Sequence, residues 1–346
     1  MWRASALGAV LAAVGWCAAP GRASADDPVV LAAGDIASCA STGDEATAAL
    51  LASLPGTVLT LGDNVYDSGA AAEFASCYDP SWGAEKARTR PSPGNHEYVT
   101  PGGAGYFAYF GASAGDPARG YYSFDLGAWH LIALNSNCGA IGGCDAGSPQ
   151  ETWLRADLVA HRSACTLAYW HHPRYSSGPH GDDARTQALW QALLDAGADV
   201  VLNGHDHTYE RFGLQDAAAN ADGNGIREFV VGTGGRSHYP IAATQPNSET
   251  HDTDTYGVLK LTLHAGSYDW QFVPVAGGTF TDAGTTVCHH APSSVGGRAS
   301  DVPRVVRRAE DGGWWWALVA GALALLLASG TAVRRARRAR PDPKRR

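Results

Sequence analysis

The sequence predicts an α/β domain in which short buried strands alternate with amphipathic helices. Apolar runs of four to six residues recur along the 346-residue chain, bounded by glycine or proline, which is typical of buried strands. Stretches with helical spacing of apolar residues separate several of these runs. Most runs end in a tight turn followed at once by Asp, Asn or His, and open α/β sheets bind ligands at such strand ends.

The strand signals are clearest at residues 29–33 and 57–61, which end in Gly34-Asp35 and Gly62-Asp63. A helix is predicted between them at residues 44–54. Because glycine lets the backbone turn sharply at little steric cost, each strand delivers an aspartate at its carboxyl end.

Later elements repeat this pattern with histidines. The strand predicted at residues 165–170 runs into His171, and the strand at 199–202 leads into Gly204-His205-Asp206-His207. The helix predicted at residues 149–160 opens with a capping box. The other predicted elements are short helical pieces at 73–77 and 82–89, a hairpin at 121–125 and 129–135, a helix at 183–196, and closing strands at 228–231, 257–263 and 268–275.

Both ends of the chain have the composition of targeting segments. Residues 1–25 combine an early arginine, an apolar run and a final Ala-Ser-Ala, as in a secretory signal peptide. Residues 313–333 contain no charged side chain and are long enough to cross a bilayer as a helix. The basic tail at 334–346 is expected in the cytoplasm by the positive-inside rule.

We therefore expect a single-pass protein of the cell membrane whose main domain, residues 26–290, is extracellular and is joined to its anchor by a linker at residues 291–312. The net charge of −8 understates how acidic this domain is, since eight of the 26 basic residues lie in the tail. An acidic surface does not attract nucleic acid, and we expect no nucleic-acid partner. An acidic protein that handles anions needs metal ions or local cations at its site.

Six cysteines follow the predicted signal peptide, and an even number in an exported chain indicates disulfides. Of the fifteen possible pairings, we favour Cys138–Cys144, Cys39–Cys77 and Cys165–Cys288. The first closes a short glycine-rich loop, and the second joins the loops after the first two strands. A thiolate metal site is the alternative, but no Cys-x-x-Cys spacing supports it.

Seven side chains at or near the predicted strand ends offer an oxygen or nitrogen ligand to a metal. They are Asp35, Asp63, Tyr66, Asn95, His171, His205 and His207. Carboxylate, amide and imidazole ligands together suit iron, zinc and manganese. Seven ligands exceed the needs of one tetrahedral ion, so the set favours two ions about 3.5–4 Å apart that share a carboxylate.

Five blocks around these residues resemble, in order, the motifs of the calcineurin-like metallophosphoesterases, and specifically of the purple acid phosphatases. The blocks are Gly34-Asp35, Gly62-Asp63-Asn64-Val65-Tyr66, Gly94-Asn95-His96-Glu97, the strand end at His171, and Gly204-His205-Asp206-His207. They cover about residues 29–211, and Ala37 stands where the family often has a second glycine. The resemblance implies a metallophosphoesterase catalytic domain over residues 26–290, folded as a four-layer αββα sandwich.

The resemblance also implies a centre of two metal ions. By motif position, Asp35, Asp63, Tyr66 and His207 would hold the first ion, which is Fe(III) in purple acid phosphatases. Asp63, Asn95, His171 and His205 would hold a second, divalent ion of zinc, manganese or iron. Tyr66 favours the purple subfamily, because phosphoesterases without this tyrosine hold other metal pairs. His172 is expected to be a supporting or structural residue, and Asp206 is expected either to orient its neighbours or to face solvent. Neither is expected to bind metal.

The implied reaction is hydrolysis of phosphate monoesters by a metal-bound hydroxide. We assign His96 and His180 to phosphate binding and to protonation of the leaving group. Two alternatives stay open: a phosphodiesterase or nucleotide hydrolase with the same site, and a surface binding protein without turnover. The second is disfavoured, since a binding module has no need of the complete ligand set and His96.

Overall fold

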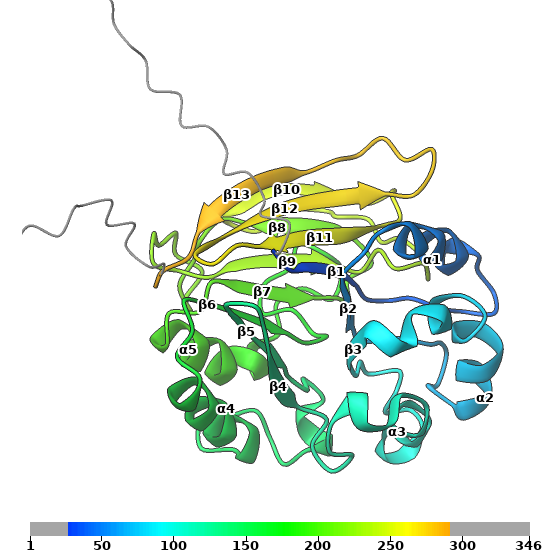
Figure 1. Ribbon diagram of the computed structural model, residues 1–346, viewed down its shortest axis with the longest axis horizontal. Helices are drawn as coiled ribbons and strands as arrows, with labels where there is room; N and C mark the ends of the chain where they lie inside the picture. The colour runs from blue at the N-terminus through cyan, green and yellow to red at the C-terminus, as the bar shows by residue number, and fades with distance from the viewer. Residues whose placement is uncertain (1–26, 291–346) are drawn as a thin grey trace, which may run out of the picture. The chain divides into compact units, whose positions relative to one another are not determined.

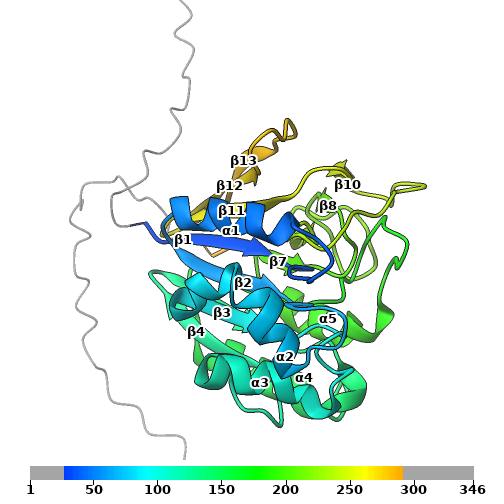
Figure 2. The same cartoon turned by 90° about the vertical axis from the view of Figure 1, so that its right-hand side faces the viewer.

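The computed structural model describes residues 27–290, which form two β-sheets with helices packed against them (Figures 1 and 2). The predicted signal peptide, linker, membrane helix and tail lie outside these residues. Within residues 27–290, the helices are all too short or too polar to cross a membrane.

The predicted strands and helices begin within a few residues of their positions in the structure. The strands are β1 (Val29–Ala33), β2 (Thr57–Leu61), β3 (Thr89–Ser92), β4 (Tyr122–Leu126), β5 (Trp129–Ala133), β6 (Cys165–Tyr169), β7 (Val200–Asn203), β8 (Tyr209–Phe212), β9 (Arg227–Val231), β10 (Ser248–Asp252), β11 (Gly257–Leu263), β12 (Ser267–Pro274) and β13 (Ala283–Val287). The α-helices are α1 (Gly43–Ser53), α2 (Ala71–Glu73), α3 (Ala104–Phe110), α4 (Pro149–Ala160) and α5 (Gln187–Asp195).

One sheet has the strand order β13-β12-β11-β1-β2-β3, and the other has the order β10-β8-β9-β7-β6-β5-β4. Strands β1, β2 and β3 are parallel to one another, as are β5, β6, β7 and β9. The carboxyl ends of parallel strands meet at one edge of a sheet, so the loops after these strands are brought together.

Alternating side chains divide the interior into two cores. In β5, Leu131 and Ala133 belong to the core between the sheets, whereas Ile132 belongs to the core beneath α4 and α5. These two helices cover the seven-stranded sheet, and α1 lies against β11 of the six-stranded sheet (Figure 1). The layers therefore follow the order helix, sheet, sheet, helix, which is the order predicted for an αββα sandwich.

Four strands, β3, β8, β10 and β13, are not predicted from the sequence. Strand β3 contains Pro91, which cannot donate a backbone hydrogen bond and is tolerated because β3 is an edge strand. Strands β10 and β13 are also edges, and their side chains are mostly polar and partly exposed. None of the three presents the apolar run by which buried strands are found.

The structure confirms all three favoured disulfides, with Cα–Cα distances of 5.0, 5.2 and 5.5 Å. The capping box of α4 is confirmed in one half only. The Ser148 hydroxyl accepts the backbone N–H of Glu151 at 3.3 Å. The Glu151 carboxylate, however, accepts the N–H of Gly147 at 2.9 Å and not that of Ser148.

Candidate metal centre

The loops that follow five parallel strands converge, and they bring the seven predicted ligands together. Asp35 follows β1, Asp63 follows β2, Asn95 follows β3, His171 follows β6, and His205 and His207 follow β7. Backbone bonds fasten these loops to one another. Asp35 donates its N–H to Gly62 O at 3.1 Å, and Gly204 donates its N–H to His171 O at 3.0 Å.

A first cluster of donor atoms surrounds the phenol of Tyr66. Its Oη lies 2.8 Å from Asp35 Oδ1, 3.1 Å from Asp63 Oδ2 and 3.2 Å from His207 Nε2. His207 Nε2 is in turn 3.3 Å from Asp35 Oδ1. These are the four residues that the sequence assigns to the first ion, and all four are buried.

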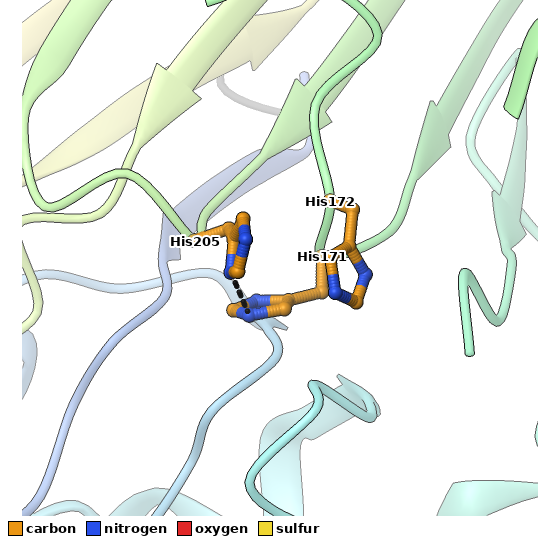
Figure 3. A group of neighbouring side chains, drawn as sticks. All are labelled: His171, His172 and His205. Atoms are coloured by element: carbon orange, nitrogen blue, oxygen red, sulfur yellow. Dashed lines mark hydrogen bonds between the residues drawn. The ribbon is translucent and has the colours of Figure 1, made fainter. Parts of the chain in front are cut away.

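A second cluster surrounds the imidazole of His171. Its Nε2 lies 3.0 Å from Asn95 Oδ1, 3.1 Å from His205 Nδ1 and 3.2 Å from Asp63 Oδ2. Figure 3 shows the rings of His171 and His205 meeting at this contact, from two different loops. Asp63 Oδ2 therefore belongs to both clusters, as a bridging carboxylate would.

The residues present fit two metal ions on several counts. Asp35 and Asp63 are buried carboxylates, and among residues 27–290 no lysine or arginine pairs with either, whereas buried charges are normally paired or bound to metal. His171 Nδ1 contacts the carbonyl of Leu61 at 2.9 Å, so it must carry the proton. This leaves Nε2 free to face the cluster, as is usual for a histidine that binds metal.

Glycine allows this close approach of the loops. A Cβ on Gly94 would lie 2.1 Å from Asp63 Oδ1, and a Cβ on Gly204 would lie 2.6 Å from Asp35 Oδ2. Three of the predicted ligands have unusual backbone conformations, since φ is 59° at Asp35, 46° at Asp63 and 73° at His205. Left-handed φ values are uncommon for residues other than glycine and often mark functional sites.

The electrostatics show how the two carboxylates are balanced without metal. Burial alone would raise the pKa of Asp63, but the neighbouring His171 and His96 lower it below its usual range. The pKa of His171 is lowered by burial but raised further by Asp63 and Asp35, to about 9. Without metal, a protonated His171 thus supplies positive charge at the point where the two clusters meet.

His96 and His180 lie beside the clusters, and both are accessible to solvent. The backbone N–H of His96 binds Asp63 Oδ1 at 2.9 Å, and its Nδ1 contacts Asp67 O at 2.6 Å. His96 Nε2 therefore faces the site, 3.9 Å from Asp63 Oδ2. His180 is exposed, and its ring lies over that of His205 with centroids 4.2 Å apart.

His172 and Asp206, which the sequence does not assign as ligands, are both held by serine hydroxyls. The Ser136 hydroxyl lies 2.7 Å from His172 Nδ1 and accepts the His172 backbone N–H at 3.0 Å. Burial, and then the neighbouring His171, lowers the pKa of His172 well below its usual range, so its ring is neutral. One nitrogen each of His171, His172 and His205 lie within 4.8 Å of one another. The Asp206 carboxylate accepts the Ser176 hydroxyl at 2.5 Å and the His180 N–H at 3.0 Å. The view that Asp206 could be a solvent residue is wrong, since it is fully buried.

Comparison with known proteins places this geometry in a family. A family model described as calcineurin-like phosphoesterase matches residues 28–209, more than half of the chain. This chain belongs to the calcineurin-like phosphoesterase family. The match covers all the loops that carry the seven predicted ligands.

Within this family, the chain resembles purple acid phosphatases. Purple acid phosphatase 15 of Arabidopsis thaliana is 29% identical over 199 residues, which are 47% of this chain and 37% of that protein. Purple acid phosphatase 22 of the same plant is 34% identical over 122 residues, 33% of this chain and 27% of that protein. The chain thus matches well under half the length of these relatives.

A solved structure shows the same fold. Purple acid phosphatase PPD1 from yellow lupin (Lupinus luteus) seeds aligns with a TM-score of 0.62 at 18% identity, over 78% of this chain and 55% of that chain. At this level of identity the likeness concerns the fold.

The roles of three residues around the clusters are not predicted from the sequence. The Glu97 carboxylate accepts the N–H groups of Asn64 at 2.8 Å, Val65 at 3.3 Å and Gly94 at 2.6 Å, which ties two ligand loops together. Ser237 Oγ lies 2.7 Å from His207 Nδ1, and the Tyr239 ring stacks on His207 at 4.0 Å. Glu97 belongs to one of the five blocks, so its position in the sequence could have indicated a role at the site.

Ser237 and Tyr239 follow the glycine-rich turn after β9, lie outside the blocks and have no such indication.

Proposed function

We propose that this protein is a phosphatase that hydrolyses phosphate monoesters at a centre of two metal ions. The observation that carries the proposal is the position of Asp63 Oδ2, 3.1 Å from Tyr66 Oη and 3.2 Å from His171 Nε2. One carboxylate shared by two donor clusters is what a pair of ions about 3.5–4 Å apart requires. The resemblance of the Tyr66 block to that of purple acid phosphatases supports Fe(III) in the first cluster and divalent zinc, manganese or iron in the second.

The proposed location is the outer face of the cell membrane. It is supported by the sequence of residues 1–25, by the apolar stretch at 313–333 and by the basic tail at 334–346. Three disulfides suit an oxidising compartment.

When bound, the two ions would neutralise charge on the phosphate oxygens and lower the pKa of a water molecule that attacks phosphorus. In the reaction this water adds to phosphorus, the ester P–O bond breaks, and the leaving oxygen takes up a proton. His96 is placed to supply that proton from Nε2, because the 2.6 Å contact of Nδ1 with Asp67 O fixes the ring. His180 is exposed beside His205, where it can contact the ester.

The test combines metal analysis with turnover of p-nitrophenyl phosphate and of bis(p-nitrophenyl) phosphate. We expect two metal ions per chain and faster hydrolysis of the monoester. Asp63→Asn should lose metal and activity together, whereas Asp116→Asn, at an exposed ion pair with Arg119, should keep both. Tyr66→Phe should remove any visible tyrosinate-to-iron absorption band. Turnover that survives Asp63→Asn, or a wild-type protein that binds no metal, would contradict the proposal.

A further inference from the structure

One arginine lies beside the candidate metal centre and takes no part in the chemistry described so far. Arg236 belongs to the loop after β9, and its backbone N–H binds the carbonyl of Asp35 at 3.0 Å. Its guanidinium carbon lies 5.0 Å from the centre of the Tyr66 ring. Among residues 27–290, it is the one lysine or arginine that contacts the side chain of a predicted ligand.

Most of the hydrogen-bonding capacity of Arg236 is free. A guanidinium has five N–H donors in a fixed plane. Arg236 uses one side-chain donor, Nη2, which lies 3.3 Å from Asp67 Oδ1. The Asp67 side chain is 80% exposed, so this ion pair competes with water and contributes little. Among the described residues, nothing else accepts a hydrogen bond from the guanidinium.

The position of Arg236 is held from two sides while its donors stay accessible. The backbone bond to Asp35 ties its loop to a predicted ligand, and the ring of Tyr66 supports the guanidinium by a cation–π contact. Its side chain is 30% exposed, so solvent or a ligand can reach it. A chain with a net charge of −8 gains a local cation where an anion would arrive.

We infer that Arg236 binds a terminal oxygen of the substrate phosphate and thereby selects monoesters over diesters, an inference that rests on the proposed function. A monoester has three terminal oxygens, so two can face the metal pair while the third faces outward. In a diester that third oxygen is esterified, carries no charge and is a poor partner for a guanidinium. The planar donors of arginine match phosphate oxygens, which a lysine ammonium does less well.

The test compares Arg236→Gln with Arg119→Gln, which removes the same charge from an exposed pair with Asp116. We expect Arg236→Gln to lower kcat/KM for p-nitrophenyl phosphate about 10- to 100-fold, the range of a charged hydrogen bond. Turnover of bis(p-nitrophenyl) phosphate should change less than about 3-fold, and Arg236→Lys should recover part of the monoester activity. Arg119→Gln should match wild type on both esters.

A second readout does not depend on turnover. Calorimetry of the metal-loaded protein should show about 10-fold weaker binding of orthophosphate to Arg236→Gln at unchanged metal content. Equal losses on both esters, or unchanged orthophosphate affinity, would overturn the inference. If wild type hydrolyses neither ester but Arg236→Gln still binds orthophosphate more weakly, the phosphatase proposal fails and the phosphate contact of Arg236 stands.

Discussion

Replacing Glu97 by glutamine is expected to destabilise the protein although the two side chains have the same shape. Glu97 is fully buried, and its two carboxylate oxygens accept three backbone N–H groups, from Asn64, Val65 and Gly94. Glutamine offers one oxygen. In its better orientation that oxygen faces Asn64 and Val65, and the amide nitrogen then faces the N–H of Gly94.

The magnitude follows from counting donors. Two buried donors, the Gly94 N–H and the new amide N–H, then lose their partners, and each costs about 1–3 kcal/mol. We therefore expect Glu97→Gln to lower the free energy of unfolding by roughly 2–5 kcal/mol. Burial, and then the nearby Asp63, raises the pKa of Glu97 to about 7, so ionising this carboxyl costs the wild type stability at higher pH. The measurement should therefore be made at about pH 4, where Glu97 is largely protonated in the folded and the unfolded chain. The hydroxyl oxygen of the protonated carboxyl can still accept the Gly94 N–H, whereas an amide nitrogen cannot.

Glu73 provides a matched control. Its carboxylate also accepts three backbone N–H groups, from Asp67, Ser68 and Ala70, at 2.9, 3.0 and 2.9 Å. Glu73 is partly exposed, so water can replace a lost bond, and Glu73→Gln should cost less than about 1 kcal/mol. Urea unfolding followed by circular dichroism, with metal removed by a chelator, compares the two variants. Equal destabilisation in both would refute the reasoning, since burial is what separates them.

Three further predictions concern the site, pH and the disulfides. Gly94→Ala would set a methyl group 2.1 Å from Asp63 Oδ1, so elemental analysis should show metal loss in a protein that remains folded by circular dichroism. Burial raises the pKa of Asp44 to about 6, so the wild type loses stability as the pH rises from about 4 to 6. Asp44→Asn should therefore be more stable than wild type at pH 8 by about 1–3 kcal/mol, with no gain at pH 3, as measured by thermal unfolding. Replacing Cys165 and Cys288, which are 123 residues apart, by alanine should cost about 5 kcal/mol in urea unfolding, against about 2 for the disulfide that spans six residues.

The convergence of the predicted ligands could be anticipated from the sequence because their signal is local. Asp35 and Asp63 follow an apolar strand and a glycine within a few residues, and His171 follows its strand directly. If the strands are parallel, their carboxyl ends lie at one edge of the sheet, so no further sequence signal is needed to bring these residues together. The remaining assignments, including that of Asp63 to both clusters, follow from the order and spacing of the five blocks.

The supporting residues could not be found in this way, because their roles depend on approach between distant segments. Ser237 contacts His207 from 30 residues further along the chain, beyond β8, which carries no clear apolar pattern, and beyond β9. Strand β3 is not predicted because it contains Pro91, although Asn95 follows this strand and lies in the second cluster. Arg236 stands in a loop whose position relative to Tyr66 is set by the sheet and not by its own neighbours in sequence.

The left-handed backbone at Asp35, Asp63 and His205 has a consequence for how the protein can evolve. Each of these residues occupies a conformation that costs an ordinary side chain about 1 kcal/mol or more and costs glycine almost nothing. Substitution by glycine would thus relieve the backbone strain but would remove the side chain that is predicted to bind metal. Mutation acting on stability alone would drift toward glycine at these three positions. All three positions instead carry a side chain that is predicted to bind metal, so the strained backbone lies where the proposed chemistry would need it.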